Sequence, residues 1–93
     1  MSDLAAFVVT LLDCLLPGDG RWPAAGATNA PRELMARIRQ DAALAATVER
    51  ARAALPAGFT GHDRAAQVYA LQRFEQDEPA SFAAILTEAF AAY

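Results

Sequence analysis

The sequence has few of the residues that catalysis or metal binding requires. It contains a single cysteine, Cys14, and a single histidine, His62. One cysteine excludes an internal disulfide and any all-cysteine metal site, and no spacing links it to the histidine as a nucleophile and a base. We therefore expect no catalytic, cofactor-binding or metal-binding residues. The apolar surroundings of Cys14 favour a buried, unreactive thiol, and His62 is expected to be exposed or to cap a helix.

Positive charge is limited to one residue type. Lysine is absent, and all eight basic residues are arginines, which are interleaved with eleven acids to give a formal net charge of −3. Nucleic-acid binding needs a basic patch or stripe that can neutralise phosphates. No such stripe is present, so we expect no nucleic-acid partner.

Long hydrophobic runs are missing as well. The most apolar stretch, residues 4–16, contains Asp13 and is shorter than the roughly 20 residues that cross a bilayer. We therefore expect no direct membrane insertion. The N-terminus has neither a basic region nor a twin arginine, so we expect a cytoplasmic protein, or a periplasmic one if its partner is exported.

What the chain does contain is alanine, the strongest helix former, and apolar residues at helical spacing. Its 93 residues suffice for one domain, residues 1–93, and not for two. We predict an all-α fold, a small bundle of about five short helices with a long Pro/Gly-rich loop after the first. A bundle of this size has a thin core, so binding to a partner would stabilise it.

The helix boundaries are predicted from apolar periodicity and from the residues that start and end helices. The expected ranges are 3–16, 31–40, 41–55, a fourth helix that follows a cap at Thr60 and ends at about residue 76, and a fifth over 79–93. Asp41 is expected to cap the third helix, although one kinked helix over 31–55 would also fit the pattern. Thr60 is expected to cap the fourth helix, with Asp63 three residues later in a variant of the capping box.

The first and last helices carry the strongest apolar signals. Apolar residues cover roughly 220° of the first helix, more than the ~100° that a surface helix needs, so this helix is expected to be central or part of an interface. The last helix has the sharpest amphipathic face. Its members are Phe82, Ile85, Leu86, Ala89, Phe90 and Tyr93.

The loop over residues 17–30 contains the only tryptophan, Trp22. Pro17 and Gly18 end the first helix, because proline interrupts the hydrogen-bond ladder and glycine accepts left-handed dihedral angles. Pro23 then keeps the chain irregular. Loops of this length between helices tend to be functional or disordered, and a large aromatic residue usually pins such a loop onto a core or a partner. We interpret the loop as a docking element.

Two segments resemble a known family. The first runs from residue 15 to residue 25 and reads LLPGDGRWPAA. The second is Leu71-Gln72-Arg73-Phe74-Glu75, followed by Pro79, Phe82, Leu86, Thr87 and Tyr93. Together they resemble the gluconate 2-dehydrogenase subunit 3 family, the small subunits of membrane-associated, flavin-dependent sugar and alcohol dehydrogenases. In that family an N-terminal helix runs into an (I/L)-(I/L)-P-G turn, and a later helix carries Phe, then Leu and Thr, then an aromatic pair.

The resemblance implies a non-catalytic accessory subunit, not an enzyme by itself. Such a subunit binds and stabilises a large flavoprotein of the glucose–methanol–choline type and holds no flavin or haem. The residues expected to shape the contact or to pack the final helix are Pro17, Gly18, Trp22, Pro23, Phe82, Phe90 and Tyr93. The alternative is a self-associating regulatory or scaffolding module, a homodimer without an enzyme partner.

Overall fold

The structure, a computed structural model, describes residues 3–18 and 23–93. These residues form five α-helices and two short 3-10 helices and contain no strand, which confirms the predicted all-α class. The α-helices are α1 (Asp3–Leu15), α2 (Ala30–Gln40), α3 (Ala42–Ala54), α4 (Arg64–Asp77) and α5 (Pro79–Ala92). The 3-10 helices are η1 (Ala25–Ala27) and η2 (Phe59–Gly61).

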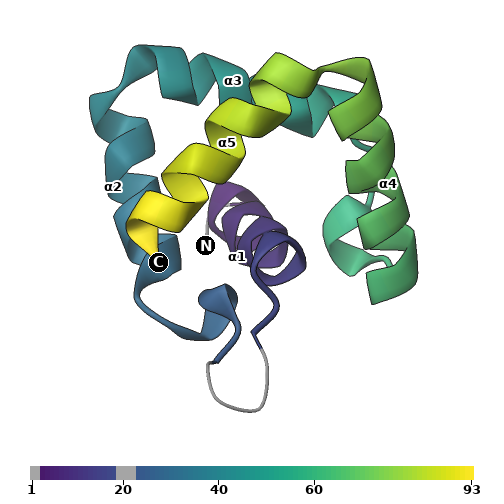
Figure 1. Cartoon of the computed structure of the whole chain (residues 1–93), viewed down its shortest axis with the longest axis horizontal. Helices are drawn as coiled ribbons and strands as arrows, with labels where there is room; N and C mark the ends of the chain where they lie inside the picture. The colour runs from purple at the N-terminus through teal and green to yellow at the C-terminus, as the bar shows by residue number, and fades with distance from the viewer. Residues whose placement is uncertain (1–2, 19–22) are drawn as a thin grey trace.

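The last helix, α5, crosses the molecule and contacts each of the four other α-helices. Figure 1 shows α2, α3 and α4 following one another around the molecule, with α1 and α5 between them. α1 also contacts α2, α4 and both 3-10 helices. The first and last helices of the chain therefore bring the others together.

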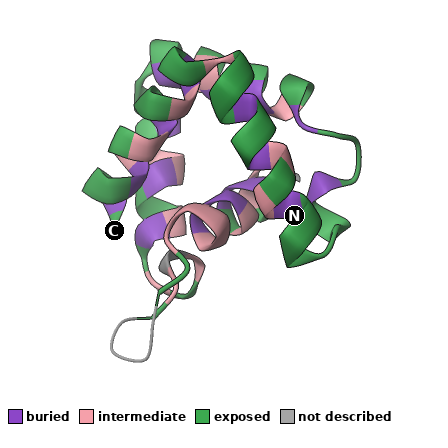
Figure 2. Cartoon of the chain, turned by 45° about the vertical axis from the view of Figure 1, so that its right-hand side comes forward, coloured by how far each residue is buried: buried purple, intermediate pink, exposed green. Residues whose placement is uncertain are grey.

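The core is built around α1, as the breadth of its apolar surface predicts. The largest side chains that are less than 2% exposed are Leu11, Leu12, Leu34, Val8 and Val48, and three of these five lie on α1. Phe7, on the same helix, packs against Phe59 of η2 with their ring centroids 5.9 Å apart. Figure 2 shows the buried residues on the inward sides of the helices and the exposed ones outside.

Two separate helices occupy residues 30–54, so the alternative of one kinked helix is wrong. The break lies at Asp41, whose backbone is extended, with φ −127° and ψ 103°. Its Oδ1 accepts hydrogen bonds from the N–H groups of Ala43 at 3.0 Å and Leu44 at 3.1 Å. These bonds satisfy donors that the first turn of a helix leaves unpaired, and they confirm Asp41 as the cap of α3.

The predicted cap of α4 is wrong by three residues. Thr60 lies inside η2, and Asp63 is the capping residue, with its Oδ1 accepting from the N–H of Ala66 at 2.8 Å. The reason is that Gly58 turns the chain with φ 77°, and the buried side chain of Phe59 then holds the following residues in a 3-10 turn. α4 begins only where that turn ends.

The buried face of α5 also differs from the predicted one. The residues that it buries are Ser81, Ile85, Ala89 and Ala92. Phe90 and Tyr93, expected to pack the helix, are 61% and 44% exposed. Small residues let α5 lie close to several other helices at once, and the larger aromatic side chains fall at the edge of that contact. Of the three predicted aromatics only Phe82 packs against the core, with its ring 6.4 Å from that of Phe74.

Candidate functional site

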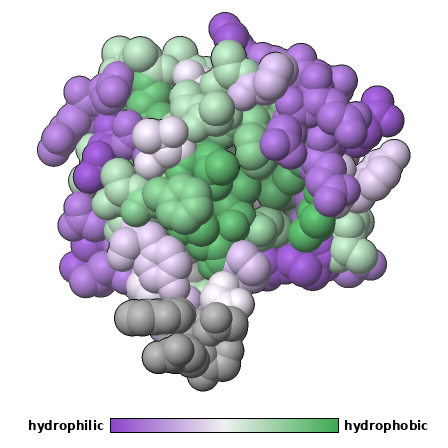
Figure 3. All heavy atoms as spheres, viewed as in Figure 1, coloured by the Kyte–Doolittle hydropathy of each residue, from purple (hydrophilic) through white to green (hydrophobic). Residues whose placement is uncertain are grey.

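A row of apolar side chains runs along one side of α5, and its last member is open to solvent. Phe82, Leu86 and Phe90 are four residues apart and so lie on one face of the helix, and we call them the α5 stripe. Phe82 and Leu86 are half-buried, whereas Phe90 is mostly exposed. Figure 3 shows apolar side chains gathered in the middle of this face, over α5 and α1, with hydrophilic residues toward its edges. Exposed apolar patches with a polar rim are typical of protein–protein contacts.

A groove of about 240 Å³ lies beside the α5 stripe, between α1, α4 and α5. Its apolar or weakly polar lining consists of Cys14, Leu15, Val68, Leu71, Phe82 and Leu86. Among the described residues that line this groove, Glu75 is the only charged one. We therefore call the hollow the Glu75 groove. His62, the base expected of a thiol–imidazole pair, does not line this groove.

Two of the predicted partner-binding residues are brought together beside the stripe. The Tyr93 hydroxyl donates a hydrogen bond to the carbonyl oxygen of Pro23, which joins the loop after α1 to the end of α5. Pro17 and Gly18 are exposed, and Gly18 has φ 79°, the left-handed conformation predicted for a glycine that ends a helix. Trp22 lies outside the described residues.

Three residues after Pro23, the same loop is held by Asp13, the acid that interrupts the apolar residues of α1. Its Oδ1 accepts a hydrogen bond from the N–H of Gly26 at 2.8 Å, and its Oδ2 lies 4.0 Å from Nη2 of Arg64 on α4. A Cβ atom at position 26 would lie 2.2 Å from Oδ1, so the close approach depends on glycine. Asp13 thus positions the loop relative to both α1 and α4.

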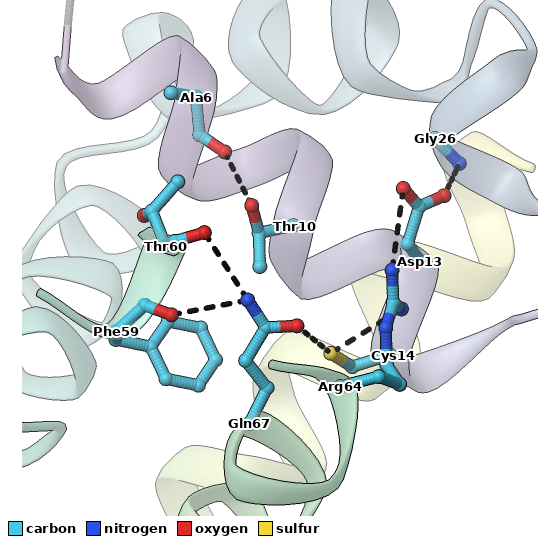
Figure 4. A network of polar contacts seen from close by, with 9 residues as sticks. All are labelled: Ala6, Thr10, Asp13, Cys14, Gly26, Phe59, Thr60, Arg64 and Gln67. Atoms are coloured by element: carbon cyan, nitrogen blue, oxygen red, sulfur yellow. Dashed lines mark hydrogen bonds and ion pairs between the residues drawn. The ribbon is translucent and has the colours of Figure 1, made fainter. Parts of the chain in front are cut away.

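A buried polar contact links α4 to α1 and η2 (Figure 4). The side-chain amide of Gln67, which is 4% exposed, donates to the carbonyl oxygens of Phe59 at 3.1 Å and Thr60 at 3.2 Å. Because both partners are acceptors, the amide nitrogen must face them, and Oε1 is left to face Cys14. The Cys14 thiol donates to that oxygen at 3.6 Å, and Arg64 donates to the sulfur at 3.5 Å.

The Cys14 thiol is held in its neutral form. Burial raises its pKa, and the nearby Arg64 guanidinium lowers it by less. A thiol with a raised pKa has little of the reactive thiolate at neutral pH. Cys14 is half-buried, so the predicted buried position is met only in part, and its raised pKa favours the neutral thiol.

His62 lies at a different hollow from Cys14. It is exposed, as predicted, and lines a pocket of about 450 Å³ with Tyr69, Arg73 and Asp77. The remaining lining residues are Ala54, Pro56, Ala66, Ala70 and Phe74. The structure therefore places the single thiol and the single imidazole in separate hollows and not in one catalytic arrangement.

Within residues 3–18 and 23–93, no three His, Cys, Asp or Glu side chains are grouped so that they could hold a metal ion. No helix of the described residues combines the length and the apolar character that a membrane crossing demands. The residues brought together around the α5 stripe are thus aromatic, aliphatic and amide groups with a few isolated carboxylates.

The chain matches no protein-family model, no curated protein and no solved structure.

Sequence patterns missed three features of this site: the contacts of Asp13, the burial of Gln67 and the exposure of Phe90. A lone acid in an apolar helix is a signal that it has a partner, but the partners of Asp13 lie on other elements. Gln67 carries no signal, because a glutamine in a helix is most often exposed. Phe90 was predicted to pack the last helix, but it lies outside the buried face of that helix.

Proposed function

We propose that this chain is a non-catalytic accessory subunit that binds and stabilises a large flavin-dependent sugar or alcohol dehydrogenase of the glucose–methanol–choline type. The observation that carries the proposal is the 61% exposure of Phe90 within an apolar face. Fully burying a phenylalanine contributes about 1.5–3 kcal/mol, so a partner that covers this face gains binding energy from it.

Several residues that carry the family resemblance lie on or beside the α5 stripe. Phe82 and Leu86, from the second resembling segment, belong to the α5 stripe, and Tyr93, also from that segment, is 44% exposed beside it. Tyr93 hydrogen-bonds to Pro23, which belongs to the first segment. A binding role accounts for the exposure of Tyr93, where a role in the core does not.

The experiment is purification of the tagged chain from its native host. We expect a flavoprotein to be recovered in equal molar amount, recognised by the absorbance of oxidised flavin and by its mass. Phe90→Asp should abolish the recovery. Tyr69→Asp is a matched control, because Tyr69 on α4 is 62% exposed and lies at the other pocket, so this variant should still bind. Recovery of the chain without flavoprotein, or equal loss in both variants, would contradict the proposal.

The exposed stripe favours one second function, a self-associating regulatory or scaffolding module. Two copies could cover each other's Phe90 in a symmetric dimer. Sedimentation of the purified chain over a range of concentrations decides between the two. A dimer that Phe90→Asp dissociates supports this second function, and a monomer at high micromolar concentration rules it out.

A further inference from the structure

We infer that the α5 stripe receives an amphipathic helix from a different protein, whose apolar row is flanked by basic side chains. The inference deepens the proposed function, on which it rests for the role of the stripe as a docking face. Two grooves flank α5, and the charged residues that line them select the occupant.

The Glu75 groove lies on one side of α5, and a second groove of about 330 Å³ lies on the other side, between α5 and α3. Asp41 and Glu88 are the charged residues that line the second groove, with Leu44, Thr47, Ala84 and Thr87. Among the described residues, the linings of the two grooves therefore contain three carboxylates and no arginine. Glu88 pairs with Arg37 at 3.2 Å, and none of the ion pairs among these residues uses Glu75. Arg37 thus offsets the charge of Glu88, and Glu75 is the carboxylate beside the stripe that no ion pair of these residues offsets.

This lining disfavours a second copy of the chain as the occupant. A symmetric dimer through this face would set the two linings against their own copies, and among the described residues neither lining contains an arginine to meet Glu75. A partner with lysine or arginine beside its apolar row meets carboxylates instead. Charge complementarity therefore selects a basic, different protein.

The shape of the face favours a helix. From Phe82 to Phe90 the stripe advances about 12 Å along α5, or roughly two turns. A helix laid alongside can place side chains at i, i+4 and i+7 on the stripe and in the Glu75 groove. Basic residues on either side of that row would then lie over Glu75 and the second groove.

The test uses the full chain, labelled with ¹⁵N, and three synthetic helical peptides as probes. The first has a leucine row flanked by lysines, the second has the same row flanked by glutamates, and the third has the composition of the first with its leucines scrambled around the helix. Chemical-shift changes map where each peptide binds and give its Kd. We expect the lysine-flanked peptide to bind at least tenfold more tightly than the other two at low salt, with its shifts confined to α5 and the Glu75 groove.

Two pairs of variants with exposed side chains locate the effect. Phe90→Ala should weaken the lysine-flanked peptide at least fivefold, whereas Tyr69→Ala, at a residue of almost equal exposure, should not change its Kd. Glu75→Gln should reduce the preference for lysine over glutamate flanks at least twofold. Glu33→Gln removes the same charge from α2, outside both grooves, and should leave the preference unchanged.

The inference is overturned if the lysine- and glutamate-flanked peptides bind equally, if neither binds, or if the scrambled peptide binds as tightly as the first. It is also overturned if the shifts centre on the His62 pocket, or if the free chain dimerises through α5. These results are independent of the flavoprotein experiment. Selective peptide binding without capture of a flavoprotein removes only the proposed enzyme partner, and capture without selectivity for basic flanks removes only this inference.

Discussion

Gly26 occupies a position where a single oxygen atom of Asp13 leaves no room for a side chain. In Gly26→Ala the new Cβ would lie 2.2 Å from that oxygen, so Asp13 must turn away and lose its hydrogen bond to the N–H of residue 26. A hydrogen bond to a charged group contributes about 1.5–3 kcal/mol, and alanine recovers about 0.4–1 kcal/mol by restricting the unfolded chain. We expect a net loss of ~1–2 kcal/mol in the free energy of unfolding, measured by urea denaturation.

Gly61→Ala is the matched control for that measurement. A Cβ at position 61 meets no atom within 4 Å, so its stability should be unchanged or slightly higher. Equal losses in the two variants would show that the contact with Asp13 is not the cause.

Cys14 makes stability depend on alkaline pH. Because burial raises its pKa in the folded protein, the folded state holds the thiol proton more tightly than the unfolded chain does. The corresponding stability is complete below the unfolded pKa of ~8.5 and is lost as the pH rises through the higher folded pKa.

We therefore expect the wild type to lose more stability than Cys14→Ser on going from neutral to alkaline pH. Serine does not titrate in this range, and its hydroxyl can keep the contacts with Gln67 and Arg64. Urea denaturation at a series of pH values measures the difference. Parallel pH profiles for the two proteins would contradict the prediction.

At the scale of helices, Asp41 separates α2 from α3. Asp41→Ala removes the oxygen that accepts from two N–H groups, so we expect a loss of about 1 kcal/mol. In a domain of this size that corresponds to a fall in Tm of roughly 4–8 °C, measured by thermal unfolding followed by circular dichroism. Asp41→Asn should retain most of the stability, because asparagine caps helices as well as aspartate does. A similar fall in both variants would point to lost charge and not to lost capping.

The helices also show where prediction from sequence stops. Asp41 was predicted correctly because capping is local: donor and acceptor are two or three residues apart. The cap of α4 was wrong because Phe59 is held by the ring of Phe7, which is remote in sequence. For α5 the periodicity identified an amphipathic helix correctly, yet its buried side was decided by the helices packed around it.

At the scale of the whole molecule, Tyr93 joins the C-terminal end of α5 to the loop after α1. Tyr93→Phe keeps the ring and removes the hydroxyl that donates to Pro23, so the loop loses one tether at a cost of about 0.5–1.5 kcal/mol. We expect the Ala27 N–H, which bonds to the Ala24 carbonyl within the loop, to exchange with solvent roughly three- to tenfold faster.

Native-state hydrogen exchange measures this change residue by residue. Buried Val48 on α3 serves as the internal control, and its exchange should slow or quicken only as global stability changes. Faster exchange at Ala27 and Val48 by the same factor would show global destabilisation and contradict a local tether.

The sequence by itself determined that this chain is helical, that its first helix has more apolar surface than a surface helix needs, and that Asp41 starts a new helix. These properties depend on apolar spacing, on local capping and on composition. Only the tertiary structure decided that Phe90 is exposed, that Asp13 holds Gly26 and that Gln67 is buried. Each of these depends on which helices meet. Contacts between residues far apart in sequence leave no local sequence pattern from which they could be predicted.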